Sequence, residues 1–200
     1  MLDADAADDA RTIAQVLAGD REAFGALVAR YARRLHDLAR RLLGDASEAE
    51  DAVQVTFLHA YRALDRFDPQ RPFRHWLLRI ATNHCRNRWA ARRRVPKPLG
   101  VGTDDDDRAA VPEPAARPPA ERGPDAERER VREALAALPE TYRVAAVLRY
   151  VHDLELTEIA EVTGDPVATV KTHLHRARAV LRRTLEPSHE TDAGRAGTDG

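Results

Sequence analysis

Residues 155–178 read ELTEIAEVTGDPVATVKTHLHRAR, and this stretch decides the fold expected for the C-terminal part of the chain. The spacing of its apolar residues predicts a short helix over about 155–162 and a longer helix over about 166–185. Gly164 between them supplies the backbone freedom that a tight turn needs. Asp165 can cap the second helix, and Pro166 fits its first turn. Two helices joined by so short a turn have the proportions of a helix–turn–helix.

The second of these helices is expected to separate apolar from polar residues. At about 100° per residue, an apolar face collects Val167, Val170, Leu174, Ala177 and Leu181. The opposite face carries small and hydrogen-bonding groups, which suit base edges in a major groove, followed by arginines that suit phosphates. An amphipathic hairpin with a solvated basic face is the alternative interpretation. The candidate DNA-reading residues on this face are Ala168, Thr169, Lys171, Thr172, His175 and Arg176.

Helical spacing also extends over most of the chain before residue 95. An apolar stripe from Phe24 to Leu42 predicts a helix that Asp20 caps and Gly44 ends. A capping box at residues 47–50, headed by Ser47, predicts the start of a second helix. A turn at residues 68–72 precedes a third helix, from residue 73 to about 94, and a shorter helix is expected over about 10–18. No strand is needed anywhere, so the expected fold class is all-α.

Composition changes sharply between the two helical parts. Residues 95–126 are rich in proline, contain the run Asp104–Asp107 and have few large apolar side chains. Such a segment buries too little surface to offset chain entropy, so it is expected to be a disordered acidic linker. The last fifteen residues, 186–200, are expected to form a disordered tail. The expected organisation is therefore two small helical domains, at 10–94 and 127–185, on either side of a flexible linker.

Charge is segregated along the chain although its total is only −1. Residues 10–94 contain 17 basic and 9 acidic side chains, for a net charge of +8, whereas residues 127–185 carry only +1. A block of +8 is a candidate surface for a polyanion. The single cysteine excludes an intrachain disulfide and a thiolate zinc cage. We see no membrane span and no secretory signal, and therefore expect a cytoplasmic protein. We also expect it to need no cofactor.

The third helix of the N-terminal part is the most basic. Its arginines are interleaved with His75, Trp76, Asn83, Asn87 and Trp89. Basic groups neutralise phosphates, and planar or amide groups stack on or bond to unpaired bases, so the mixture favours melted or distorted DNA. For Trp76, burial in the core is an equally good interpretation. The candidate DNA-contacting residues here are Arg74, Trp76, Arg79, Asn83, Arg86, Arg88, Arg92 and Arg93.

The helix before it carries a polar, acidic patch. This patch consists of Glu48, Glu50, Asp51 and Gln54. Acidic side chains repel DNA, so the patch is either a protein-docking face or an ordinary solvated helix surface.

Three stretches together resemble bacterial RNA polymerase sigma factors of the extracytoplasmic-function class, within the sigma-70 family. Residues 45–57, DASEAEDAVQVTF, resemble the polymerase-binding helix of that family. Residues 71–83, RPFRHWLLRIATN, resemble its promoter-melting helix. Leu138-Pro139, the residues EIA at 158–160 and TVKTHLHRAR at 169–178 resemble the signature of its second domain.

The resemblance implies that 10–94 is a domain like sigma region 2 and 127–185 a domain like sigma region 4. Glu48, Asp51 and Gln54 would bind core RNA polymerase. The basic helix around Asn83 would bind and melt the downstream, minus-ten promoter element. The second helix of the helix–turn–helix, now including His173, would read the upstream, minus-thirty-five element. Core polymerase, promoter DNA and an anti-sigma factor are the implied partners. The chain departs from the family pattern at Val55, Ala168 and His173.

Two other classes of function were weighed against a transcription initiation factor. A stand-alone helix–turn–helix regulator needs no polymerase-docking face and usually binds paired half-sites as a dimer. An enzyme finds little support, because the sequence holds no His-Glu-x-x-His motif, phosphate loop or Cys/His cluster. We therefore expect a sigma factor that is not an enzyme.

Overall fold

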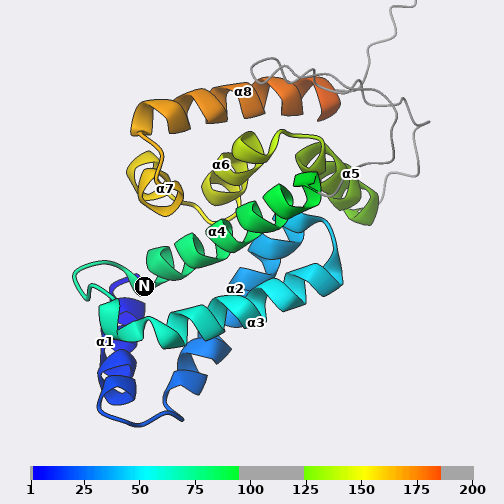
Figure 1. Ribbon diagram of the computed structural model, residues 1–200. Coiled ribbons are helices and arrows are strands. Elements are labelled where there is room, and N and C mark those ends of the chain that lie inside the picture. Colours follow the sequence, from blue (N-terminus) through cyan, green and yellow to red (C-terminus); the bar gives the residue numbers. More distant parts are fainter. Residues whose placement is uncertain (1, 95–123, 186–200) are drawn as a thin grey trace, which may run out of the picture.

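The computed structural model describes residues 2–94 and 124–185, and within these residues every regular element is a helix (Figure 1). This confirms the all-α fold class. The predicted linker up to residue 123 and the predicted tail from 186 lie outside the described residues.

The first group of helices, called here the N-terminal block, spans residues 2–94. It consists of α1 (Leu2–Leu17), α2 (Phe24–Leu43), α3 (Ala46–Arg62), a 3₁₀ turn at Leu64–Arg66 and α4 (Phe73–Arg94). The second group, the C-terminal block, consists of α5 (Pro124–Ala136), α6 (Glu140–Tyr150), α7 (Leu156–Thr163) and α8 (Val167–Leu185). Figure 1 shows α4 crossing the middle of the molecule, between α2 and α3 on one side and α6 and α7 on the other.

The predicted helix–turn–helix is present as α7, a turn and α8. Gly164 adopts a left-handed conformation with φ of 77°, and its backbone N–H donates to the carbonyl of Ala160 at 2.9 Å. A side chain at this φ is strained, which explains why glycine ends α7. The first backbone bond of α8 runs from the N–H of Val170 to the carbonyl of Pro166 at 3.0 Å, so Pro166 stands at the helix start as predicted.

Two predicted helix starts are wrong in detail, and both errors concern polar side chains. The start of α3 is capped by Asp45, whose carboxylate accepts from the backbone N–H of Glu48 at 2.9 Å, rather than by Ser47. The carboxylate of Asp20 accepts from the N–H groups of residues 22 and 23, at 3.1 and 3.2 Å, in a turn before α2 begins at Phe24.

The first helix is longer than predicted, because α1 begins at Leu2 rather than near residue 10. Its buried acid Asp9 accepts hydrogen bonds from Arg30 and from the hydroxyl of Tyr31, both on α2. A buried carboxylate that is paired in this way is tolerated in a core. Apolar periodicity does not reveal such a contact, because the residue that fixes the helix is charged.

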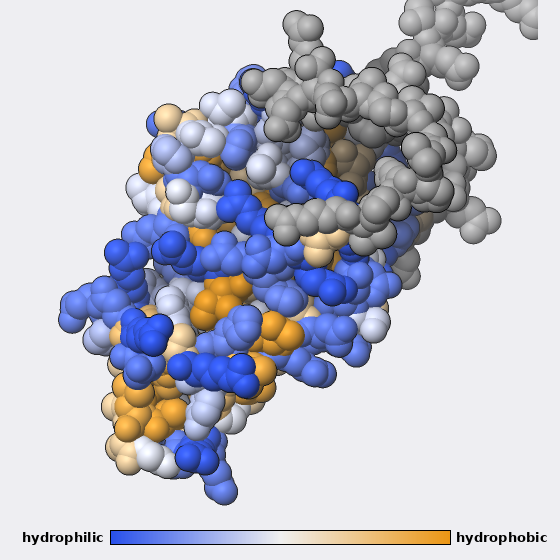
Figure 2. Space-filling model, in the orientation of Figure 1, coloured by the Kyte–Doolittle hydropathy of each residue, from blue (hydrophilic) through white to orange (hydrophobic). Residues whose placement is uncertain are grey.

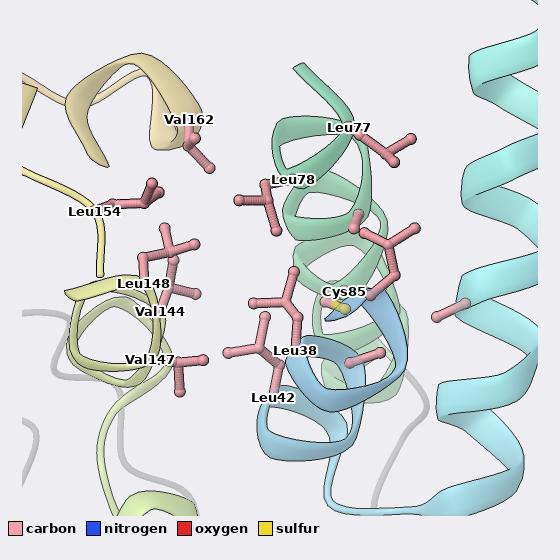
Figure 3. Packing of buried hydrophobic residues seen from close by; sticks show 14 of the residues in the cluster. Leu38, Leu42, Leu77, Leu78, Cys85, Val144, Val147, Leu148, Leu154 and Val162 are labelled. Carbon is pink, nitrogen blue, oxygen red and sulfur yellow. The ribbon is translucent and has the colours of Figure 1, made fainter. Parts of the chain in front are cut away.

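The two blocks share one hydrophobic core (Figure 3). Figure 3 shows Leu78 of α4 directed at Leu154 and Val162 of the C-terminal block, whereas Leu77 is directed at α3. Leu38 and Leu42 of α2 complete the N-terminal side of this contact, opposite α6. These side chains are almost fully buried, so the C-terminal block covers part of α2 and α4. Two domains are thus present as expected, but they are packed against each other.

Candidate nucleic-acid interface and docking face

The polar face of α8 is open to solvent. Ala168, Lys171, Thr172, His175 and Arg176 are exposed, and Thr169 and His173 are half-buried. The opposite face packs into the core through Val170, Leu174, Ala177 and Val180. The two faces are separated as predicted, except at three positions: Val167 and Leu181 are only partly covered, and Val180 is buried instead.

Tyr142 of α6 supports two residues on the polar side of α8. The guanidinium Nη1 of Arg176 donates to the Tyr142 hydroxyl at 2.8 Å and its carbon lies 5.9 Å from the ring centre. The ring of His173 lies 5.4 Å from the same tyrosine ring, and burial lowers the pKa of His173. Sequence reasoning missed Tyr142, since it belongs to another helix and its role depends on packing.

The candidate residues on α4 have very different surroundings. Arg79 and Asn83 are exposed, one helical turn apart. Trp76 is half-buried, with its ring 5.2 Å from that of Phe67 and 5.5 Å from that of Phe73. Trp76 therefore takes part in the core while keeping an accessible edge. Trp89, which the sequence offers as a further stacking group, is buried, so that prediction is wrong.

Three of the predicted DNA-contacting arginines on α4 reach the C-terminal block instead. Arg74 donates to the backbone carbonyl of His152. Arg86 donates to the carbonyl of Thr163 at 3.0 Å and lies 3.7 Å from the carboxylate of Asp165, in the turn before α8. Arg93 forms an ion pair of 3.0 Å with Glu140 at the start of α6. These contacts engage the guanidinium groups for which the sequence predicts DNA contacts.

Arg143 and His152 fix the buried centre of the same interface. Arg143 donates to the carbonyls of Leu42 at 2.8 Å and Leu138 at 2.9 Å, and its guanidinium lies 5.6 Å from the Trp89 ring. Burial lowers the pKa of Arg143. Burial also lowers the pKa of His152, in this case to about 4. At neutral pH His152 is therefore neutral, and the Arg143 guanidinium is held by backbone carbonyls from both blocks.

A second kind of surface lies on α3. Glu50, Asp51 and Gln54 are exposed, as are two large apolar residues on the same side of the helix, Leu58 (46 % exposed) and Tyr61 (37 %). At about 100° per residue these five side chains fall within one arc of the helix. Exposed apolar groups rimmed by polar ones mark protein-binding surfaces. The sequence pattern contained this signal for Leu58 and Tyr61, which follow Gln54 at helical spacing.

Glu48 lies apart from this docking face. Its carboxylate accepts from Arg92 and lies 3.4 Å from the guanidinium of Arg88, both on α4. The structure therefore brings a residue predicted for polymerase binding together with two residues predicted for DNA binding. Figure 2 shows hydrophilic residues along most of the strip that α4 occupies in Figure 1.

In residues 2–94 and 124–185, no helix combines the length and apolar character that crossing a bilayer requires.

Comparison with known protein families identifies both blocks. Residues 27–95 match the family described as Sigma-70 region 2, and residues 128–181 match the family described as Sigma-70, region 4.

Similar full-length proteins are also known. The chain is 36% identical to the ECF RNA polymerase sigma factor SigW of Bacillus subtilis, over 88% of this chain and 95% of the relative. It is 34% identical to the RNA polymerase sigma-H factor of Pseudomonas aeruginosa, over 90% of this chain and 94% of the relative. The shared identity thus extends through both blocks.

Two solved structures resemble the whole molecule. CnrH, in complex with the cytosolic domain of CnrY, matches with a TM-score of 0.64 and 33% identity, over 89% of this chain and 97% of that chain. The sigma factor RpoE of Bartonella quintana, in complex with the anti-sigma factor NepR, matches with a TM-score of 0.63 and 26% identity, over 81% of this chain and 96% of that chain.

Proposed function

Because this chain belongs to the extracytoplasmic-function class of the sigma-70 family of RNA polymerase sigma factors, we propose that its helices divide promoter recognition and polymerase binding among α3, α4 and α8. The protein directs core RNA polymerase to promoters and starts transcription there. This role is non-catalytic and belongs to the cytoplasm, where the bacterial genome is transcribed. A stand-alone regulator is not favoured, because the similarity to sigma factors covers nearly the whole chain.

The upstream promoter element is assigned to α8. Its polar face is solvent-exposed and ends in arginines, the arrangement with which a recognition helix enters a major groove. Thr169, Thr172 and His175 offer hydrogen-bonding groups for base edges, and Lys171 and Arg176 offer cations for phosphates. Tyr142 holds Arg176 in place, which reduces the entropy lost on binding. Ala168 and His173 complete this surface.

The downstream element is assigned to α4. Arg79 and Asn83 are open to solvent in the present arrangement, and the half-buried Trp76 lies one turn before Arg79 and Ile80. A cation, an amide and an aromatic edge on one helix suit an unpaired strand, whose bases stack and whose phosphates need neutralisation. The remaining predicted arginines already have protein partners, which phosphates would have to replace; they are Arg74, Arg86, Arg88, Arg92 and Arg93.

Core polymerase is assigned to the docking face on α3. Asp51 and Gln54 supply its polar groups, and Leu58 and Tyr61 supply apolar area. One observation supports this assignment of functions to the three helices. The chain combines an exposed acidic and apolar face on α3 with two helices, α4 and α8, whose basic residues suit DNA. A regulator that binds DNA alone needs no such face.

Promoter binding requires the two blocks to separate. Elements named for positions minus ten and minus thirty-five lie about 25 base pairs apart, or about 85 Å along the duplex at 3.4 Å per pair. In this structure α4 and α7 are packed together. The packed arrangement is therefore the form that exists before both elements are bound. The solved sigma factor of Bartonella quintana is bound to an anti-sigma factor, and we extend this class of partner to the present chain.

Transcription in vitro tests the assignment of α3. Purified core polymerase and genomic fragments are incubated with the wild-type protein or with Asp51→Lys, and transcripts and core binding on native gels are measured. We expect new start sites with the wild type and a loss of more than about tenfold in core affinity with the variant, because reversed charge at a protein interface repels the partner.

The matched control is Glu22→Lys, which makes the same charge change at an exposed site of the same block. It should behave as the wild type. Equal losses in the two variants would remove the assignment of the docking face to α3, and an absence of protein-dependent transcripts would remove the initiation function itself.

A further inference from the structure

We propose that Glu48 is an internal counterion which holds Arg88 and Arg92 in the absence of DNA and which phosphates of the downstream promoter strand replace. This inference rests on the proposed assignment of α4 to DNA. It gives Glu48 a positioning role within the DNA-binding surface, in place of the polymerase contact that the sequence predicts.

The geometry of the cluster makes one carboxylate serve two cations. Arg88 and Arg92 are four residues apart on α4, so their side chains lie on the same side of that helix. Each uses a different oxygen of Glu48: Arg92 donates to Oε2, and Nη2 of Arg88 lies 3.4 Å from Oε1. The carboxylate is 24% exposed, whereas the two arginines are 48% and 46% exposed. The cations are therefore accessible from solvent while the carboxylate lies beneath them.

The orientation of Glu48 separates it from the docking face on α3. At about 100° per residue, Glu48 lies about 60° from Asp51, at the near edge of that face, and about 120° from Gln54 around the helix axis. Its backbone N–H is also fixed, by the cap contact to Asp45 at 2.9 Å. The contacts with Arg88 and Arg92 show that the side chain is directed toward α4, outside the arc that carries Leu58 and Tyr61.

Electrostatics keep the cluster ionised but leave it exchangeable. The hydrogen bond from Arg92 lowers the pKa of Glu48, although partial burial opposes this effect. Ion pairs whose arginines are half exposed contribute little net stability and are screened by salt. A phosphodiester is tetrahedral, but its two non-bridging oxygens can accept from a planar guanidinium as the two oxygens of a carboxylate do. Exchange of Glu48 for phosphate therefore replaces one set of bonds with an equivalent set.

The exchange has a measurable consequence for salt dependence. With Glu48 ionised, the three side chains carry a net charge of +1, and with a neutral residue at 48 they carry +2. Each additional phosphate neutralised on a single strand steepens the plot of log affinity against log salt by about 0.7. Removal of the internal counterion should therefore both tighten DNA binding and increase the salt slope.

The test uses the full-length protein and a fluorescein-labelled, single-stranded 20-mer of mixed sequence, titrated at several salt concentrations. Glu48→Gln is expected to bind about three- to tenfold more tightly at low salt, with a slope steeper by about 0.7. The control Glu22→Gln removes one exposed negative charge elsewhere in the same block and should change affinity less than twofold. Core binding by Glu48→Gln should equal that of the wild type.

The outcomes separate this proposal from the function on which it rests. Weaker DNA binding by Glu48→Gln, or an equal gain in Glu22→Gln, overturns the counterion role and leaves the assignment of α4 standing. Loss of core binding by Glu48→Gln returns the residue to the polymerase contact. If Arg92→Ala binds the probe as tightly as the wild type, the DNA assignment of this end of α4 fails together with the counterion role. Thermal unfolding of each variant shows that the comparison is made between folded proteins.

Discussion

The two helices of this sigma factor that we propose to bind DNA, α4 and α8, differ in what surrounds their polar faces. On α8, most of the predicted reading residues are exposed, and Arg176 donates to the hydroxyl of a tyrosine, Tyr142. On α4, Arg79 is exposed, but five other arginines are paired with carboxylates or carbonyls from α3, α6, α7 and the segments that flank α7; these are Arg74, Arg86, Arg88, Arg92 and Arg93. One helix presents its polar face to solvent, whereas the other already has protein acceptors at the positions proposed for DNA phosphates.

The difference follows from the position of each helix in the fold. The helix α8 packs through a single face, so its other face remains in solvent. The helix α4 packs against α2 and α3 on one side and α7 on another, so several of its arginines lie within reach of acceptors on neighbouring elements. A basic sequence on a central helix therefore gains internal partners, and its availability depends on whether the C-terminal block is in place.

The largest expected effect comes from loosening the contact that covers α4. Leu78→Ala should cost about 2–5 kcal/mol, because it deletes buried methyl groups and leaves a cavity. Leu77→Ala is the matched change, since Leu77 is equally buried but directed at α3 (Figure 3). Urea unfolding measures both losses, and small-angle X-ray scattering measures the overall dimension. We expect similar losses of stability but an expanded molecule only for Leu78→Ala; equal dimensions would contradict the proposed role of Leu78.

Lowering the pH should destabilise the same contact between the two blocks, with a smaller loss of stability than Leu78→Ala causes. His152 has a pKa of about 4 in the folded protein against an ordinary value of 6.5, because burial disfavours its charged form. The unfolded chain therefore binds more protons between pH 6.5 and 4, and stability is lost as the pH falls through this window. From pH 7 to pH 5 the loss attributable to this group is about 2 kcal/mol.

The charged groups that face His152 come from α2 and α4 of the N-terminal block: Asp37 raises its pKa, and Arg74, Arg41 and Arg34 lower it. Urea unfolding of the wild type and of His152→Gln at pH 5, 6 and 7 checks this expectation. The difference in stability between the two proteins should shrink as the pH falls. A constant difference would show that His152 does not titrate in this range.

The smallest expected effects distinguish how the two helices bind DNA. Arg92→Ala should weaken binding to promoter-like DNA by about 1 kcal/mol for every sequence and flatten the salt dependence, because it removes a phosphate contact. Thr172→Ala should instead change preference among upstream sequences by about 1 kcal/mol, because it removes a base-edge contact. Competition binding with a panel of duplexes measures both. The same sequence-independent loss in both variants would refute the assignment of α8.

The sequence predicted what apolar spacing and turn residues control. The helix–turn–helix at Gly164, the end of α2 at Gly44 and the two faces of α8 follow from periodicity and backbone conformation, which are local. The partners of the α4 arginines could not be predicted in this way. Asp165 and Glu140 lie 79 and 47 positions after the arginines they contact, and only tertiary packing brings them together.

The surroundings of the two tryptophans show the same limit. Trp76 and Trp89 lie on one basic helix with similar neighbours in sequence. Trp89 is buried beneath Arg143 of the other block, whereas Trp76 keeps part of its surface because it packs on Phe67 and Phe73 at the edge of the core. Helical periodicity places a residue on a face, but the coverage of that face depends on elements far along the chain.

The single cysteine of this protein can report how often the core around it opens. Cys85 is fully buried between α4 and α2, close to Leu38 (Figure 3), and burial raises the pKa of its thiol to about 12. Because the thiolate is the reactive form, a disulfide reagent can modify only molecules in which this part of the core has opened. The rate of modification therefore measures how often this part of the core opens, and it does so in the wild-type protein without a label. The same reaction with core polymerase, promoter DNA or an inhibitor added would show whether each partner raises or lowers the frequency of opening.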